Sequence, residues 1–510
     1  MKDYFIEKMH DFASCSMLLT GFAVTAFVSI IIRVLYLLYL HPYAKYPGPK
    51  IAAISDAWWG YQWLSGRYPW AIEASFKKYG DVFRIAPNEI AIFPFEAHQD
   101  MLLSGRNGSA TFIKTDIHPT FTPGELGVFA ERDIEKHRSS KQVLSRAFSL
   151  AAHKNQDTAL HSIVDGFIHQ IEAKKLPEDD VNVTEWFGWL AADLIGEMSI
   201  GHSFENVSSG RANVFIRNFF VTAPLTNLLT VLTRFPCMGP LVRWNIPRKT
   251  LKPLVDVLDE LKTGLKERVS QGSSVKHNDY FTPLLQQNKS VYSEDFLFSQ
   301  LTAIVIPLEA VASLMQSIVT CLGLHQDILK KVQAEIRTNF ATWEDLEEAD
   351  VLQGLPWLSA VVNESLRFHT IATFPQPRVS PGGVIGGYYI PKGCRVQSST
   401  FSMFRSERYF KKAREYHPER WLPPSHADYD NIFDNDNRAV FQPFSMGPRK
   451  CLGFVTADRQ ARAVISKLLW KFDWEIGNAS DLDWERDMKV YQVTVRPTVL
   501  VKFKPCRHQD

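Results

Sequence analysis

A cysteine near the C-terminal end has surroundings that favour a thiolate. Cys451 follows a turn-forming Gly-Pro pair at 447–448 and precedes an amphipathic helical run. The N–H groups and dipole of a helix N-terminus, together with Arg449 and Lys450, favour a negatively charged sulfur. A thiolate is a good ligand for a soft metal or for haem iron, and Gly453 leaves room for a flat group. The alternative is a buried structural cysteine, which is the usual state of a free one and which the lone residue favours.

A second candidate lies in an apolar helical segment in the middle of the chain. The window 296–329 has helical periodicity, and Ser293 is a suitable N-cap before it. Pro307 removes a backbone hydrogen bond there, and Glu309 puts a carboxylate on an otherwise apolar turn. Both residues lower the stability of a helix in an apolar setting. This turn is therefore either a kinked helix with its acid at the surface or part of a functional site.

Several motifs resemble those of the cytochrome P450 superfamily, and they occur along the chain in the family's order. The stretch ESLR at 364–367 resembles the family's Glu-x-x-Arg pair on the K helix, and HPERW at 417–421 resembles its Pro-Glu-Arg segment. The stretch YPGPK at 46–50 resembles the proline-rich hinge behind the membrane anchor. The stretch 441–454, FQPFSMGPRKCLGF, is similar to the haem-thiolate signature, whose marked positions include Phe444, Gly447, Arg449, Cys451 and Gly453. The resemblance covers essentially the whole chain, and its N-terminal half is similar to filamentous-fungal microsomal members.

The resemblance implies that the chain binds haem b. Cys451 is expected to be the axial thiolate ligand of the iron, and therefore the metal-binding residue. Phe444 is expected to shield the sulfur and Gly447 to shape the turn. Arg449 and Arg378 are expected to bind the haem propionates, because the guanidinium fork matches a carboxylate.

Two further sets of residues take roles from the resemblance. Glu364, Arg367 and Arg420 are expected to form a buried charge network beneath the haem, which acts as a fold element and not as a catalyst. At the C-helix position the family has Trp-x-x-x-Arg or, in fungi, His-x-x-x-Arg, and this chain has His137 and Lys141. Lys141 keeps a positive charge for a propionate without the arginine fork. The alternative for His137 is a histidine on a helix surface.

The motif order places residues 293–325 on the long I helix over the haem. The family pattern Ala/Gly-Gly-x-Asp/Glu-Thr-Thr becomes IPLEAV at 306–311. Pro307 is expected to open the helix by removing a hydrogen bond, and Glu309 is a candidate proton donor on the oxygen-binding side. Ala310 lacks the hydroxyl of the usual proton relay. Three alternatives follow. Glu309 and water deliver the proton alone, or the substrate supplies the missing hydroxyl. In the third, the reaction depends less on that relay, as in desaturation, ring expansion, rearrangement or phenol coupling.

The resemblance implies a monooxygenase that uses O2 and NADPH through a separate NADPH–cytochrome P450 reductase. No Gly-x-Gly-x-x-Gly motif stands between a strand and a helix to bind a nucleotide. By family analogy the pocket is lined by mostly apolar segments, at 112–121, 215–232, 305–311, 371–374 and 491–493. We therefore expect oxidative tailoring of a hydrophobic fungal polyketide, terpenoid or alkaloid. The alternatives are an oxygen-independent haem-thiolate isomerase or dehydratase, and a haem sensor or carrier without turnover.

The N-terminus has the composition of a membrane anchor. No residue from 12 to 32 is charged, and a helix of that length spans about 31 Å, close to the hydrocarbon thickness. A signal peptide would have a shorter apolar core and a cleavage site, and a buried helix is the other alternative. The excess of basic residues after the span favours a cytosolic body on the endoplasmic reticulum, although Asn-x-Ser/Thr sequons would suit a lumenal one.

Composition and periodicity indicate one large, mainly α domain with a minor β-sheet, as in the cytochrome P450 fold. Of 510 residues, 45% are hydrophobic and 22% charged, and the net charge of +2 does not suggest a nucleic-acid partner. The six cysteines are scattered, which argues against a disulfide scaffold or zinc ribbon. Helical patterns occur at 72–79, 132–148 and throughout 155–370, and β-type runs occur at 82–93, 383–396 and 498–505. We expect an anchor at 1–40, a hinge at 41–50 and a catalytic domain at 51–510.

Overall fold

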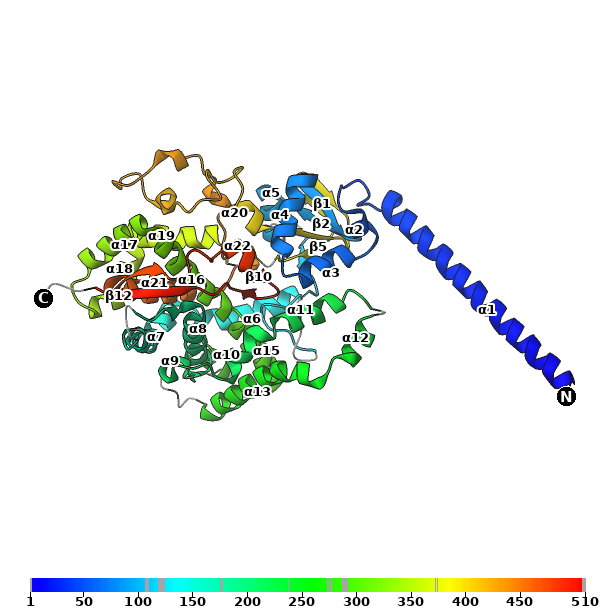
Figure 1. Cartoon of the computed structure of the whole chain (residues 1–510), viewed down its shortest axis with the longest axis horizontal. Coiled ribbons are helices and arrows are strands. Elements are labelled where there is room, and N and C mark those ends of the chain that lie inside the picture. Colours follow the sequence, from blue (N-terminus) through cyan, green and yellow to red (C-terminus); the bar gives the residue numbers. More distant parts are fainter. Residues whose placement is uncertain are drawn as a thin grey trace.

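The computed structural model has a mainly helical body from which one long helix projects (Figure 1). It describes residues 2–105, 110–117, 124–174, 178–236, 238–272, 275, 278–286, 292–371, 373 and 375–506, with side chains from residue 16. The helices before residue 240 are α1 (Lys2–Leu35), α2 (Lys50–Ile54), α3 (Ala57–Leu64), α4 (Tyr68–Tyr79), α5 (Phe95–Leu103), α6 (Ile134–Ala147), α7 (Leu150–Glu172), α8 (Val183–Ile200), α9 (Asn206–Ser209), α10 (Val214–Val221), α11 (Ala223–Leu232) and α12 (Gly239–Asn245). Those that follow are α13 (Arg248–Gln271), α14 (Thr282–Gln286), α15 (Glu294–Val305), α16 (Leu308–Leu324), α17 (Gln326–Asn339), α18 (Ala349–Gly354), α19 (Pro356–Phe368), α20 (Thr400–Phe404), α21 (Phe454–Lys471) and α22 (Trp484–Asp487). The predicted mainly α fold is confirmed.

Strands from distant parts of the chain form the small sheets. The largest has the order β1-β2-β8-β5-β3 and joins residues 82–114 to residues 378–398. Its members are β1 (Val82–Ala86), β2 (Glu89–Ile92), β3 (Ile113–Lys114), β5 (Arg378–Val379) and β8 (Arg395–Ser398). The other strands are β4 (Val181–Asn182), β6 (Gly383–Ile385), β7 (Tyr388–Ile390), β9 (Phe472–Ile476), β10 (Lys489–Val490), β11 (Thr494–Val495) and β12 (Leu500–Pro505). The β-type runs predicted at 82–93, 383–396 and 498–505 all contain strands.

Helix α1 leaves the body beside the largest sheet and has no neighbour along most of its length (Figure 1). The stretch 16–40 is long and apolar enough to cross a membrane, and an 18-residue apolar window within it has no buried residue. The stretch 294–324 meets the same test, but 78% of it is buried inside the body. Helices α10 and α11 meet it only as a bent pair. Within the described residues, the N-terminal helix is therefore the apolar span that the protein itself leaves uncovered.

The hinge behind α1 is docked on the body. Tyr43 is fully buried, and the guanidinium of Arg84 in β1 donates a hydrogen bond to the carbonyl oxygen of Leu37 (2.6 Å). The backbone N–H of Arg84 donates to the carbonyl oxygen of Pro47 (2.8 Å). A Cβ atom on Gly48 would lie 2.5 Å from the Arg84 carbonyl oxygen, so only glycine allows this approach. These contacts fix the direction in which the anchor leaves the body.

The segment expected to be one long I helix is two helices, α15 and α16. Ser293 caps α15 as predicted, since its side chain accepts a hydrogen bond from the N–H of Phe296. The helix stops at Val305 because Pro307 has no N–H and its ψ of −2° turns the chain. The sequence predicted a locally opened helix, and the structure has a complete break at residues 306–307. Glu309 therefore lies in the first turn of α16.

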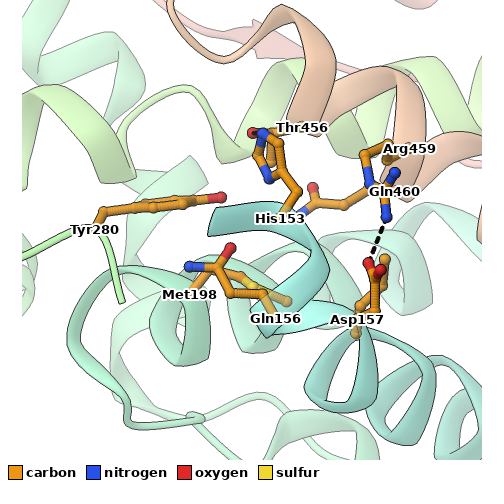
Figure 2. A pocket seen from close by; sticks show the side chains of 9 residues that line it. His153, Gln156, Asp157, Met198, Tyr280, Thr456, Arg459 and Gln460 are labelled. Carbon is orange, nitrogen blue, oxygen red and sulfur yellow. Dashed lines mark hydrogen bonds and ion pairs between the residues drawn. The ribbon is translucent and has the colours of Figure 1, made fainter. Parts of the chain in front are cut away.

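Helix α21, which follows the cysteine loop, is held in place by α7. Arg459 forms an ion pair with Asp157, and His153 Nε2 lies 3.4 Å from Thr456 Oγ1 (Figure 2). The polar pocket that these residues line, with Tyr280 at its side, has a volume of about 10 Å³ and is only large enough for about one water molecule. The contacts around this pocket hold the helix that follows Cys451, and the pocket itself is too small to bind a substrate.

Candidate functional site

The loop that carries Cys451 is closed by its own backbone. The N–H of Cys451 donates to the carbonyl oxygen of Phe444 (3.0 Å), and a short 3₁₀ turn at Gly447–Arg449 lies between them. Gly447 has φ of +74°, and a Cβ there would lie 2.5 Å from the carbonyl oxygen of Leu102 in α5. Glycine is required at this position for both reasons. Helix α21 begins at Phe454, three residues after the cysteine, so Cys451 precedes the helix N-terminus instead of lying on it.

The Cys451 side chain is accessible to solvent. Cys321 and Cys394 are buried, whereas Cys451 is exposed. The pKa of the Cys451 thiol is raised, because burial outweighs the Gly453 N–H and the charges of Lys141 and Lys450, which lower it. Without a ligand, these surroundings do not produce the thiolate that the local sequence favoured. A Cβ on Gly453 would meet no atom within 4 Å, so open space lies beside the loop. An accessible thiol next to open space fits a flat ligand that covers the sulfur.

Helix α6 fastens this loop from the other side. The Lys141 ammonium donates to the carbonyl oxygens of Pro448 (2.7 Å) and Lys450 (2.9 Å). Its charge is therefore used by the backbone of the cysteine loop. His137, one turn earlier, is buried, and burial together with the neighbouring cations lowers its pKa to about 3. A neutral buried histidine here excludes the surface alternative.

Arg378 lies opposite a second buried cation, Lys114, which was not predicted from the sequence. Lys114 in β3 is paired with Arg378 in β5, and the two side chains are 6% and 3% exposed. Arg378 donates to the carbonyl oxygen of Gln376 (2.8 Å), and Lys114 donates to that of Phe129. Burial, and then the charge of Arg449, lowers the pKa of Arg378 to about 9. Burial and the neighbouring cations hold the pKa of Lys114 well below its usual value.

Four basic side chains thus form a cluster, which we call the cation cluster: Lys114, Lys141, Arg378 and Arg449. The Arg449 guanidinium donates to the carbonyl oxygen of Glu131 (2.6 Å), so it too is held by backbone. In the part of the chain that the structure describes, no member has an ion pair with a carboxylate. Lys114 and Arg378 are buried, whereas Lys141 and Arg449 are half-buried and Arg449 has Glu131 and Asp133 nearby. The two buried cations without a paired anion are costly. The cluster therefore fits a ligand that carries carboxylates, as the haem propionates would.

A cavity of about 260 Å³ lies between α10, α13, the α15–α16 break and the C-terminal segment. Four of the five predicted segments contribute, namely 215–232, 305–311, 371–374 and 491–493. No described residue of 112–121 lines it, and 118–121, like Phe374, lie outside the described residues; residues 125–130 contribute instead. The wall includes Gln376, two residues before Arg378, and Phe129, whose carbonyl binds Lys114. No member of the cation cluster lines the cavity, but these two wall residues accept hydrogen bonds from Arg378 and Lys114.

Glu309 and Ala310 lie side by side in the wall of this cavity. Glu309 is 7% exposed, so the alternative of a surface acid is wrong. Ser313 Oγ donates a hydrogen bond to Glu309 Oε1 (2.6 Å). Burial raises the pKa of Glu309, as a proton donor near neutral pH requires.

Comparison with known proteins identifies the family. The family model for cytochrome P450 matches residues 58–503. The chain belongs to the cytochrome P450 family. It is 34% identical over 483 residues to the cytochrome P450 monooxygenase poxC of Penicillium oxalicum, and the aligned region covers 94% of both chains. It is 32% identical over 500 residues to the cytochrome P450 monooxygenase TwmD of Talaromyces wortmannii, covering 97% of this chain and 98% of the relative. A P450 carries haem iron with a thiolate ligand, so this chain is a haem-dependent oxidoreductase of the monooxygenase type.

The Glu-x-x-Arg pair of this P450 is part of a buried charge network. Glu364 accepts two hydrogen bonds from Arg367 (2.7 and 2.9 Å) and one from Arg420 (3.2 Å). The Trp421 indole N–H and the His417 backbone N–H complete its shell at 2.9 Å each. Burial raises the pKa of Glu364, but the two arginines outweigh it and the pKa is lowered. The network joins α19 to the 418–421 turn, which agrees with the expected structural role.

Three residues in or beside the site of this P450, namely Lys114, Thr494 and Arg496, were not predicted from the sequence. Lys114 lies in a two-residue strand, and Thr494 and Arg496 lie in or beside another. Each reaches the site through a partner more than 150 residues away. A basic residue in TFIKTD and another in TVRP carry no local signal for such contacts.

Proposed function

We propose that this P450 is a haem b monooxygenase that oxidises a hydrophobic fungal secondary metabolite. Its electrons come from NADPH–cytochrome P450 reductase at the endoplasmic reticulum membrane. The observation that carries the proposal is one cavity whose wall includes Glu309 and Ala310, and also Phe129 and Gln376, which accept hydrogen bonds from the cation cluster. The relatives are fungal proteins named as monooxygenases, and the uncovered N-terminal helix suits a membrane anchor.

The residues that would hold the haem follow from the fit described above. Cys451 would ligate the iron, with Phe444 and Gly447 shaping the loop around it. Arg378, Arg449 and Lys114 of the cation cluster would bind the propionates, beside the buried His137, while Lys141 holds the cysteine loop. When bound, the haem supplies the reductive activation of dioxygen.

The cavity indicates the charge of the substrate. Glu125 and Glu309 are the charged side chains among its described lining residues, and no lysine, arginine or histidine is among them. Phe215, Phe219 and Leu261 belong to its apolar wall. A carboxylate would be desolvated there without a cation to pair with, which is costly. The substrate is therefore a neutral or cationic hydrophobic molecule.

The reaction type depends on the turn with Glu309 and Ala310. Glu309 is placed to hold a proton at the cavity wall, and Ala310 offers no hydroxyl beside it. Desaturation, ring expansion, rearrangement or coupling therefore remain in the proposal beside hydroxylation. The same alanine favours the second candidate, an oxygen-independent haem-thiolate isomerase or dehydratase.

Co-expression with a fungal reductase tests the proposal. Microsomes are incubated with a panel of neutral, amine and carboxylic acid precursors, with and without NADPH and O2, and products are analysed by mass spectrometry. A monooxygenase requires both reagents and prefers the neutral or amine members. Product without O2 would identify the isomerase instead, and a haem protein that turns over no member would support the sensor alternative.

A further inference from the structure

One hydroxyl in the wall of the large cavity has no hydrogen-bond partner. Thr373 is 6% exposed and lines the cavity, as do Ile371 and Gln376 on either side of it in the chain. Its Oγ1 atom is buried and forms no hydrogen bond with any described residue. Among the described residues that line the cavity, it is the one buried side-chain polar atom of this kind. A buried hydroxyl without a partner is costly, so a ligand atom that binds it is stabilised.

Other hydroxyls in the same wall are satisfied by the backbone. Four of them lie on helices or directly after one, and each donates a hydrogen bond of 2.7 to 3.0 Å to the carbonyl oxygen three residues earlier; they are Thr222, Thr226, Ser299 and Thr302. Thr373 lies five residues after α19 ends at Phe368, so no helical carbonyl lies one turn before it. Its hydroxyl is therefore free for a group inside the cavity.

The segment that carries Thr373 is anchored at both ends. At its start, Thr370 has φ of +45°, a left-handed conformation that is strained for a β-branched residue. The Thr370 hydroxyl donates to the carbonyl oxygen of Arg367 (2.8 Å), and Arg367 belongs to the buried network around Glu364. At its end, β5 pairs with β3 and β8 of the largest sheet. The charge network and the sheet therefore hold this segment against the cavity.

We propose that Thr373 is a specificity-determining residue, whose hydroxyl forms a hydrogen bond with an oxygen atom of the substrate. A ketone or a hydroxyl group fits, because the surrounding wall is mostly apolar and no cation lies among the described lining residues to pair with a carboxylate. The inference rests on the proposed function and narrows its substrate class. The hydrophobic substrate already carries an oxygen, and that oxygen fixes its orientation in the cavity.

Binding of matched neutral probes to the haem-loaded full chain tests the inference without turnover. The probes are tetralin with α-tetralone and fluorene with fluorenone, so the members of each pair differ by one carbonyl oxygen. Equilibrium dialysis gives a dissociation constant for each probe, and the ratio of hydrocarbon to ketone is compared between variants, which cancels the difference in hydrophobicity. Thr373→Val should lower this ratio by roughly two- to tenfold, which is the effect of one neutral hydrogen bond.

A second readout reports the hydrogen bond itself. The infrared carbonyl band of bound fluorenone should lie at lower wavenumber in the parent than in Thr373→Val, because a hydrogen bond weakens the carbonyl bond. Thr373→Ser keeps the hydroxyl and should restore both the band and the ratio. If Thr373→Val does not fold, Thr373→Ala replaces it with the same expected result.

Thr302→Val is the matched control. Thr302 is also buried and lines the cavity, but its hydroxyl donates to the carbonyl oxygen of Ser299 (2.9 Å), so its loss should leave the ratio unchanged. A parental ratio for both pairs in the folded Thr373→Val variant, or an equal fall in Thr302→Val, overturns the inference. If the ratio falls as expected but no precursor is oxidised with NADPH and O2, the inference stands and the monooxygenase function fails. If precursors are oxidised and the ratio does not fall, only the inference fails.

Discussion

Lys114 and Arg378 are directly paired across the antiparallel β3–β5 ladder, so two buried cations are cross-strand neighbours. Like charges in that position destabilise a sheet, and burial adds to the cost. Such a destabilising pair is the arrangement expected of a site that binds an anion, as we propose for the haem propionates. The strands are only two residues long, so the repulsion is not offset by a long ladder.

Lys114→Met should have opposite effects on the stability of the haem-free protein and on the retention of haem. It removes one of the repelling charges, so the haem-free protein should become more stable to denaturant. The haem-loaded protein should lose haem faster, because we propose that Lys114 binds a propionate. Haem transfer to an acceptor protein measures the loss, and Lys136→Met, on the exposed surface of α6, is the control. A variant that holds haem as well as the parent would remove Lys114 from the cofactor site.

Glu364→Gln should cost far more stability than a matched surface change. It leaves the buried Arg367 with a neutral partner and removes one of the two carboxylates that pair with Arg420, the other being Asp436. Breaking a buried pair in this way costs about 3–5 kcal/mol. Glu135→Gln breaks an exposed pair with Arg138, which is worth at most about 1 kcal/mol. Thermal unfolding of the two haem-loaded variants gives the comparison. Equal melting temperatures would refute the structural role of the network.

The position of an N-terminal truncation should decide the stability of the product. Deletion of residues 2–35 removes α1 but keeps Leu37, whose carbonyl oxygen binds the buried Arg84 guanidinium. Deletion of residues 2–40 leaves that guanidinium with a lost partner, at a cost of about 1–3 kcal/mol. Both products should shift out of the membrane fraction, and the longer deletion should melt at lower temperature. Identical melting temperatures would show that the docked hinge contributes nothing.

His369 should make the folded protein sensitive to acid. It is buried, with Nδ1 2.7 Å from Ser317 Oγ, and burial followed by the charges of Arg405 and His325 holds its pKa well below the usual value. Below about pH 6.5 the unfolded chain binds a proton there that the folded chain does not, so stability falls as pH falls, by up to about 1.4 kcal/mol per pH unit. His369→Gln should flatten that slope in denaturant titrations.

The control for this prediction is His169→Gln. The His169 side chain is 88% exposed, so its removal should leave the pH dependence as it is in the parent. If His369→Gln keeps the parental slope between pH 6.5 and 5, the acid sensitivity has another origin.

Local chemistry in the sequence predicted much of this site. Gly447 and Cys451 belong to one loop whose turn, charge and following helix are all readable within a few residues, and Ser293 marks a helix start in the same way. The break at residues 306–307 was only half predicted, because proline opens a helix to a degree that depends on its packing. The Lys114 and Arg496 contacts depend on which strands and helices meet, and one sequence does not contain that information.

The central claim is that the chain is a haem-thiolate enzyme with Cys451 as the ligand. The most direct measurement is the absorption spectrum of the reduced, carbon-monoxide-bound protein, recorded for the parent and for Cys451→Ser, with Cys394→Ser as a control at a buried cysteine outside the site. If Cys451 ligates the iron, the parent and the control show the thiolate spectrum and Cys451→Ser loses it. A Cys451→Ser protein that retains the thiolate spectrum would contradict it.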